Sequence, residues 1–230
     1  MGDDLKGFAY LFAAICFILA LRGLSSPESA RNGNYFGITG MVVAVGITLF
    51  DPSILSFELI ISGVLIGGAI GTVIALKIKM TALPQLVAFF HSLVGLAAVF
   101  VATAAFFEPE VYGIGTKGNI KAASLVEMSL GTAIGAITFS GSIVAFAKLQ
   151  ELVKGAPIIF RGQHPINTLL GGLLVALIIW LVVSNNEQAF WSIVILSLLL
   201  GFLIIIPIGG ADMPVVVSML NSYSGWAAAG

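Results

Sequence analysis

The chain has 230 residues, of which 59% are apolar and only 9% are charged. A soluble domain carries about 25% charged residues, so this composition does not supply enough charge to cover a soluble surface. Ten basic and eleven acidic residues leave a net charge of −1, which excludes a basic nucleic-acid-binding protein and an acidic tail. The single cysteine, Cys16, excludes a disulfide framework and a thiolate metal cluster. These features predict a polytopic membrane protein.

Eight apolar runs approach the length of about 20 residues that a helix needs to cross the hydrocarbon core. They cover residues 7–24, 35–50, 54–76, 84–107, 124–147, 166–183, 189–207 and 213–229. No run alternates between apolar and polar residues as the strands of a membrane β-barrel do. We therefore predict an all-α integral membrane protein, in which residues 1–230 form one polytopic bundle of about eight transmembrane helices.

The charges around these runs predict the orientation of the chain. Lys6 precedes the first run as in a signal peptide, but Asp3 and Asp4 make that end net negative, which favours a retained helix. Seven basic residues follow the odd-numbered runs: Arg22, Arg31, Lys77, Lys79, Lys148, Lys154 and Arg161. Only three lie at the N-terminus or after even-numbered runs. Because basic loops stay in the cytoplasm, the N-terminus and the end of the eighth run are expected outside.

Two runs carry stripes of small residues. Overlapping GxxxG units occur in the third run, at Gly63, Gly67 and Gly71. In the fifth run, residues that share one helical face are Gly131, Gly135, Thr138 and Ser142. We interpret the glycines as surfaces for close helix packing.

One ionisable residue lies well inside an apolar run. His91 is eight residues into the fourth run. An ionisable group in a membrane helix is costly and usually marks a pathway. Histidine changes charge near neutral pH, so a buried histidine can relay protons. The alternative is a neutral histidine that makes one structural hydrogen bond to a neighbouring helix.

The eighth run begins like a capped helix and then turns polar on one face. Asp212 stands two residues before Pro214, which is typical of a helix start with a carboxylate at its N-cap. The polar or small residues that share one face of the run are Ser218, Asn221, Ser222 and Gly225. Capping explains Asp212 but does not explain Asn221.

Depth in the membrane brings three polar residues to a similar level. At 1.5 Å per residue, His91, Ser142 and Asn221 lie about 10, about 7 and about 13 Å from the cytoplasmic side. We expect these three side chains to share a water-filled cavity with Asp212 at its inner mouth. Weaker candidates for the same path are Glu127, Ser218 and Ser222. The chain has no GxGxxG, GxxxxGK[ST] or His-Glu-x-x-His motif, so we expect no cofactor site, no metal site and no catalytic residue of its own.

Three stretches of the sequence match one known family. They cover residues 81–96, 135–146 and 209–226. The last reads Gly-Gly-Ala-Asp-Met-Pro-Val-Val-Val-Ser-Met-Leu-Asn-Ser-Tyr-Ser-Gly-Trp, a pattern long enough to be highly specific. Over essentially its whole length the chain resembles the membrane domain of the proton-translocating NAD(P) transhydrogenase β subunit.

The resemblance implies a function and a set of site residues. Family members couple proton movement across a bacterial inner membrane, or its mitochondrial counterpart, to hydride transfer between NADH and NADP⁺. His91 matches the membrane histidine of the proton path, and Ser142 and Asn221 match its polar partners. Asp212 matches the acid near the surface where the NADP(H)-binding domain docks, a surface that we expect to include Lys148, Lys154 and Arg161.

The resemblance also implies partners and further segments. NAD(H) and NADP(H) bind to soluble domains of the complex, which contains a transhydrogenase α subunit and assembles as a homodimer. In the family, a ninth helix and the NADP(H)-binding domain follow the eighth helix, and an outer end at residue 230 agrees with this order. We therefore expect these parts to be missing from the sequence, so that this chain alone is not catalytically competent.

Two alternatives from other functional classes stay open at the level of sequence. A stand-alone proton-coupled secondary transporter or ion channel would also place polar residues inside glycine-rich helices, although no inverted repeat is evident. A purely structural membrane anchor would tolerate replacement of the polar residues in the fourth and eighth runs.

Overall fold

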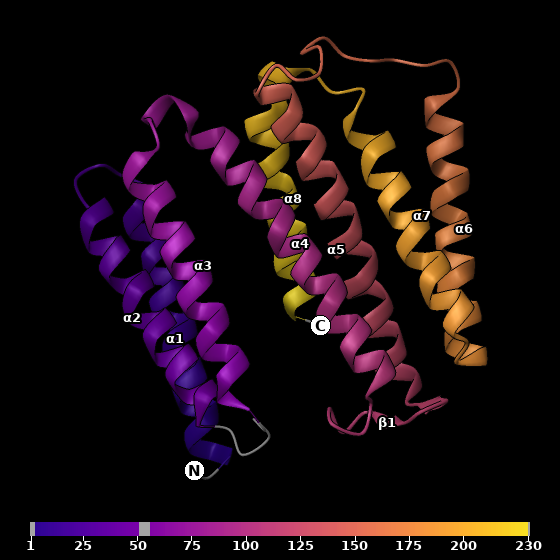
Figure 1. Ribbon diagram of the computed structural model, residues 1–230, viewed down its shortest axis with the longest axis horizontal. Coiled ribbons are helices and arrows are strands. Elements are labelled where there is room, and N and C mark those ends of the chain that lie inside the picture. Colours follow the sequence, from indigo (N-terminus) through magenta and orange to yellow (C-terminus); the bar gives the residue numbers. More distant parts are fainter. Residues whose placement is uncertain (1–2, 51–55, 230) are drawn as a thin grey trace. The chain divides into compact units, whose positions relative to one another are not determined.

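The computed structural model describes residues 3–50 and 56–229, and these form eight α-helices with two short 3₁₀ turns and one small hairpin (Figure 1). The helices are α1 (Asp3–Leu24), α2 (Ala30–Leu49), α3 (Phe57–Lys77), α4 (Leu83–Phe107), α5 (Ala122–Leu149), α6 (Gln163–Ser184), α7 (Glu187–Ile205) and α8 (Met213–Ala229). The 3₁₀ turns η1 (Met80–Ala82) and η2 (Gly210–Asp212) precede α4 and α8. The predicted all-α class is confirmed.

Each predicted apolar run coincides with one helix, and the differences lie at the ends. The largest is at α2, which begins at Ala30 rather than at residue 35. Its first turns contain Arg31 and Asn32, so an apolar count misses a segment that is nevertheless helical. The predicted start of the third run, residues 54 and 55, lies outside the described residues.

Six of the described helices are long and apolar enough to cross a membrane: α1, α3, α4, α5, α6 and α7. The helix α8 has 17 residues, fewer than the about 20 that span the hydrocarbon core. The helix α2 is not among the six either, and its first half carries several polar residues. That all eight helices cross the membrane therefore stays a prediction. The class of helical membrane protein holds with six spans as well as with eight.

The chain divides into two compact units, residues 1–76 and 77–230. In the first, α1 and α2 form a tight helical hairpin, in which a Cβ added to Gly23 would lie 2.5 Å from the Cα of Gly33. The hydroxyl of Ser29 closes the turn by donating to the carbonyl of Gly23 at 2.7 Å. Cys16 is buried in this hairpin as a free thiol.

The glycine stripe of α3 has no packing partner among the described residues of its own unit. The three glycines of this stripe, Gly63, Gly67 and Gly71, have nothing within 4 Å of an added Cβ, and α3 buries no residue. Within the described part of residues 1–76 this face has no packing partner, and its close packing stays a prediction. A GxxxG pattern makes a smooth helix surface, but a partner must be present to use it.

In the second unit, α5 is the central helix and buries residues on most of its circumference. It runs antiparallel to α4, because Gln85 at the start of α4 donates its side-chain amide to the carbonyl of Leu149 at the end of α5, at 2.9 Å. The helices α7 and α8 pack against other sides of α5, and α6 packs against α7 (Figure 1).

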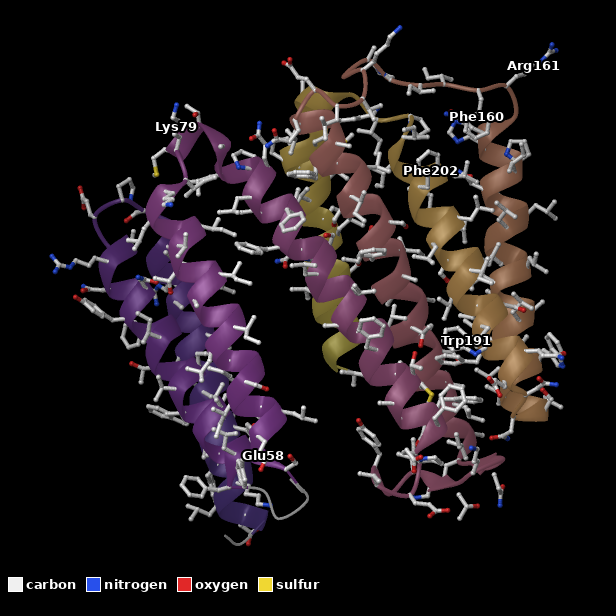
Figure 2. The ribbon with its side chains drawn as sticks, in the orientation of Figure 1. Glu58, Lys79, Phe160, Arg161, Trp191 and Phe202 are labelled. Atoms are coloured by element: carbon white, nitrogen blue, oxygen red, sulfur yellow. The ribbon has the colours of Figure 1, made fainter. Side chains whose placement is uncertain are left out.

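The two ends of this unit are closed by different interactions. At one end, the hairpin of β1 (Gly115–Thr116) and β2 (Asn119–Ile120) links α4 to α5, and the amide of Ile120 donates to Asn185 at 3.0 Å. The rings of Phe106 and Phe190 stack there at 4.7 Å. Figure 2 shows Lys79 and Arg161 at the opposite end, as the predicted alternation of loops requires.

Candidate functional site: a buried polar cluster around His91

His91 is buried on the side of α4 that packs into the bundle. Its side chain is 6% exposed. The buried positions of α4 recur with helical spacing and are Ala88, His91, Ser92, Gly95, Val99, Ala102 and Phe106. The histidine therefore belongs to the same stripe as the apolar packing residues, and its burial follows from its register on the helix.

The backbones of α4 and α5 approach closely at Gly95, and this contact determines which residues of α5 lie opposite His91. A Cβ added to Gly95 would lie 2.6 Å from both the carbonyl oxygen of Gly135 and the backbone nitrogen of Phe139. The same added Cβ would lie 3.1 Å from Thr138. Because the two helices are antiparallel, His91, one turn before Gly95, lies level with Ser142, one turn after Thr138. The structure therefore brings His91 and Ser142 to the same level of one interface.

The polar atoms of this cluster have hydrogen-bonding capacity to spare. His91 Nε2, Thr138 Oγ1 and Ser142 Oγ are buried and have no hydrogen-bond partner among the described residues. Ala88, one turn before His91 on α4, packs in one buried cluster with Leu220 of α8. Buried polar groups are almost always satisfied by a protein group or by water. These three groups are therefore the unpaired polar atoms of an otherwise tightly closed interface.

A cavity of about 260 Å³ adjoins this cluster between α5 and α8. It is lined by Ile134, Ile137, Thr138, Leu220 and Tyr223. Since one water occupies about 30 Å³ in the liquid, the cavity has room for several molecules. Its walls are mostly apolar, and Thr138 and Tyr223 are the two lining residues that carry a hydroxyl.

The polar face of α8 does not join the cluster. Asn221, Ser218 and Ser222 are exposed, whereas the opposite face packs inward. The inward residues are Met213, Val216, Val217 and Leu220. The expectation that Asn221 shares a cavity with His91 and Ser142 is therefore not met in the described residues. An amphipathic pattern identifies two faces of a helix, and here the apolar face is the one that contacts α4 and α5.

Asp212 lies where the sequence predicts, at the start of α8. It is exposed, it ends the turn η2, and α8 begins at the next residue. Beside it is a polar cavity of about 530 Å³. The lining residues include Lys148, Glu151, Lys154, Gly155 and Gly210. The loop after α5 and the start of α8 thus form one charged surface.

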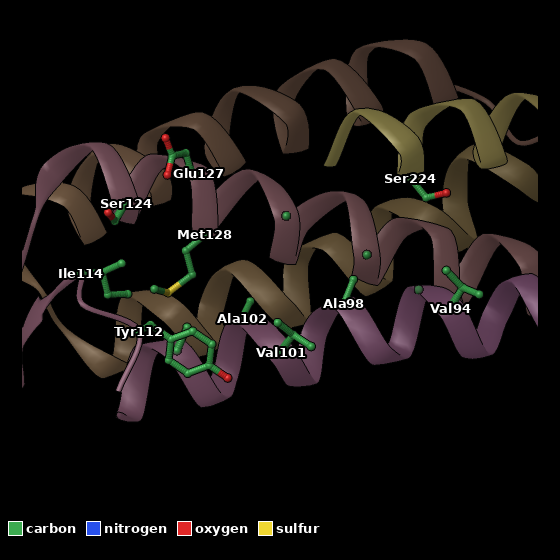
Figure 3. A pocket seen from close by; sticks show the side chains of 14 residues that line it. Val94, Ala98, Val101, Ala102, Tyr112, Ile114, Ser124, Glu127, Met128 and Ser224 are labelled. Atoms are coloured by element: carbon green, nitrogen blue, oxygen red, sulfur yellow. The ribbon is translucent and has the colours of Figure 1, made fainter. Parts of the chain in front are cut away.

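Glu127 lies away from His91, in a longer groove. This groove of about 480 Å³ runs along α4 and α5 (Figure 3). Glu127 and Ser124 lie at one end of it, and Val94 and Ser224 lie at the other (Figure 3). Its lining includes several small residues: Gly95, Ala98, Ala102, Gly131 and Gly135.

Sequence reasoning missed two residues of functional interest. Thr138 appeared only as part of a packing stripe, although its spacing of four from Ser142 was the available signal. Lys148 was expected in an exposed loop but is 2% exposed inside the last turn of α5. No pattern in the sequence distinguishes it from Lys154, which is exposed. Within the described part of the chain, no cluster of three or more His, Cys, Asp or Glu side chains could hold a metal ion.

Comparison with known proteins agrees with the resemblance inferred from the motifs. The family described as NAD(P) transhydrogenase beta subunit matches residues 6–230. Two relatives, both named NAD(P) transhydrogenase subunit beta and both from Rhodospirillum rubrum, are 63% identical over 230 residues. The match covers 100% of this chain and 50% of each relative, so the chain spans about half the length of the curated relatives it matches. The chain belongs to the NAD(P) transhydrogenase beta subunit family.

Proposed function

We propose that this chain is the proton-translocating membrane part of a transhydrogenase that couples proton movement across the membrane to hydride transfer between NADH and NADP⁺. The observation that carries the proposal is His91: a buried imidazole whose Nε2 has no partner in the described residues and which lies level with buried hydroxyls. An ionisable group at this depth is costly unless it serves a pathway.

In this proposal, water held by Thr138 and Ser142 delivers protons to His91 and removes them. The Nε2 atom, which has no partner among the described residues, is the one that exchanges the proton. Access to the ring alternates between the two sides of the membrane. The polar residues of α8, with Asn221 among them, take part where another helix of the complex covers them, because an asparagine facing lipid is unfavourable.

Coupling to nucleotide chemistry takes place at the surface around Asp212. The NADP(H)-binding domain docks there, and its redox state biases access to His91. Two distinct sites are then linked, so NADP(H) affinity and protonation of His91 must influence each other equally. NAD(H) and NADP(H) bind to soluble domains of the complex, and this chain contributes neither nucleotide site.

The proposal includes the assembly and its location. The complex contains a transhydrogenase α subunit and the NADP(H)-binding domain, assembles as a homodimer and lies in a bacterial inner membrane. The N-terminus faces outward, and the loops after α1, α3, α5 and α7 face the cytoplasm, as the distribution of basic residues indicates.

The decisive experiment compares wild-type, His91→Ala and His164→Ala complexes in proteoliposomes. Hydride transfer from NADH to NADP⁺ and internal pH are recorded together. We expect His91→Ala to abolish the proton signal, because the exchanging atom is gone. His164 is the only other histidine and is exposed, so its replacement should leave both signals unchanged.

Three outcomes would count against the proposal. If the His91→Ala complex kept full proton coupling, His91 would not belong to the proton path, and the chain would be better explained as a structural membrane anchor. A proton signal without nucleotides or partner subunits would favour the stand-alone transporter. The same conclusion would follow if the complete wild-type complex transferred no hydride.

A further inference from the structure

Lys148 is a buried lysine whose ammonium is held by backbone carbonyls. Its side chain is 2% exposed in the last turn of α5. Nζ donates to the carbonyl oxygens of Ile208 at 2.6 Å, Ile206 at 2.7 Å and Ala156 at 3.4 Å. A lysine ammonium has three donors, so these carbonyls use all of them.

The three carbonyls come from two segments that Lys148 thereby joins. Ala156 lies in the loop after α5, and Ile206 and Ile208 follow the end of α7 on the way to α8. The last carbonyls of a helix have no partner within it, and a cation there is favourable because of the helix dipole. We call these four residues, Lys148, Ala156, Ile206 and Ile208, the Lys148 junction.

Backbone hydrogen bonds reinforce the same junction. The amide of Gly210 donates to the carbonyl of Gly155 at 2.7 Å, and the amide of Ile158 donates to that of Ile206 at 3.3 Å. The loop after α5 and the segment between α7 and α8 are therefore joined at several points around one ammonium. A displacement of either segment would leave the ammonium without partners in a buried position, which is strongly unfavourable.

The junction leads directly to the helix that contacts His91. Met213, the first residue of α8, is fully buried and packs in one cluster with Ile205 and Ile206. Leu220, two turns further along α8, belongs to the same cluster, which also contains Ala88, one turn before His91 on α4. Since a helix is stiff over this length, the position of its first turn sets the position of Leu220 against α4, one turn from His91.

We propose that Lys148 is a positioning residue that transmits movements of the surface around Asp212 to the His91 cluster. It does so by fixing the segment between α7 and α8, and so the register of α8 against α4. The inference rests on the proposed function, but it assigns a role to a residue that neither binds nucleotide nor exchanges a proton with the path.

The test uses the complete complex in proteoliposomes and the ratio of protons moved to hydride transferred. Lys148→Met removes the ammonium and keeps most of the aliphatic stem. We expect this ratio to fall by about twofold or more, as mutations between coupled sites commonly do. Lys121→Met is the matched control, because Lys121 also donates to a backbone carbonyl, that of Gly113 at 3.2 Å, but is exposed at the other end of α5. Its ratio should equal that of the wild type.

The ratio separates positioning from stability. If Lys148→Met lowers hydride transfer and proton movement in equal proportion, Lys148 only supports the fold and the inference is wrong. If the variant does not assemble, Lys148→Gln replaces it, since the amide keeps two donors on a shorter arm; a smaller fall in the ratio is expected. An unchanged ratio in Lys148→Gln would overturn the inference.

Failure of the inference and failure of the proposed function are distinguishable in the same preparation. If wild type couples protons to hydride transfer and both lysine variants do so equally well, only the role of Lys148 is wrong. If wild type transfers hydride without moving protons, the proposed function itself is wrong.

Discussion

The interface between α4 and α5 and the outer face of α8 carry similar sequence patterns but have opposite environments. Both present small and hydroxyl residues at helical spacing. At the interface, Thr138 and Ser142 are fully buried beside His91, whereas Ser218 and Ser222 on α8 are exposed. The comparison shows that periodicity identifies a face, and that packing decides whether the face becomes a site.

The physical difference lies in the glycines. Gly95 and Gly135 let the backbones of α4 and α5 touch, which closes the space around the polar side chains. On α8 the inward positions are occupied by larger apolar residues, which pack against α4 and α5 and keep the polar face of α8 away from them. Three substitutions would break or sharpen this contrast.

The largest effect is expected at the glycine contact. In Gly95→Ala the new Cβ would lie 2.6 Å from backbone atoms of Gly135 and Phe139, which cannot rotate away. We expect the free energy of unfolding to fall by about 2–3 kcal/mol, as for other overpacked cores. Thermal unfolding of the purified complex measures it. Gly131→Ala is the control, because nothing lies within 4 Å of its added Cβ. Equal effects of the two substitutions would show that the contact does not hold the interface.

An intermediate effect is expected from removing a buried hydroxyl. Thr138→Val preserves shape, and the hydroxyl has no protein partner in the described residues, so the free energy of unfolding should change by less than about 1 kcal/mol. The rate of proton movement should fall by up to about tenfold, the equivalent of one lost hydrogen bond. Thr103→Val is the control, because the Thr103 hydroxyl, unlike that of Thr138, already has a protein partner: it donates to the carbonyl of Val99 at 2.7 Å. A normal proton rate in Thr138→Val would remove this hydroxyl from the water path.

The smallest effect is expected on the exposed face of α8. Ser222→Ala should change the free energy of unfolding by no more than about 0.5 kcal/mol, because exposed substitutions rarely do more. Thermal unfolding in the same buffer as for Gly95→Ala allows direct comparison. A loss as large as that of Gly95→Ala would mean that the face is covered in the assembled complex, and the contrast between the two regions would disappear.

Much of the fold follows from local composition. The apolar runs predict each helix, because the length of a spanning segment and the need to satisfy its backbone leave few alternatives. The ends are less certain, as at α2, since polar first turns are helical without being apolar. The family was also identified from sequence, because residues 209–226 carry a long, specific pattern.

The candidate site was predicted only in part. His91 and Ser142 were identified because polar groups in apolar helices are costly, and the structure places them at one level of one interface. Asn221 was expected beside them from depth alone, but depth does not fix the direction in which a helix face points. Lys148 was grouped with exposed basic residues, because its type and neighbours in sequence resemble theirs.

The sequence by itself determined the helical class, the helix order and the unusual histidine, since each depends on side-chain polarity along one segment. Only the tertiary structure decided which face of α8 packs inward, how closely the backbones of α4 and α5 approach, and that three carbonyls enclose Lys148. These properties depend on contacts between residues distant in sequence. Helical periodicity is the same for a face that is buried and for one that is exposed.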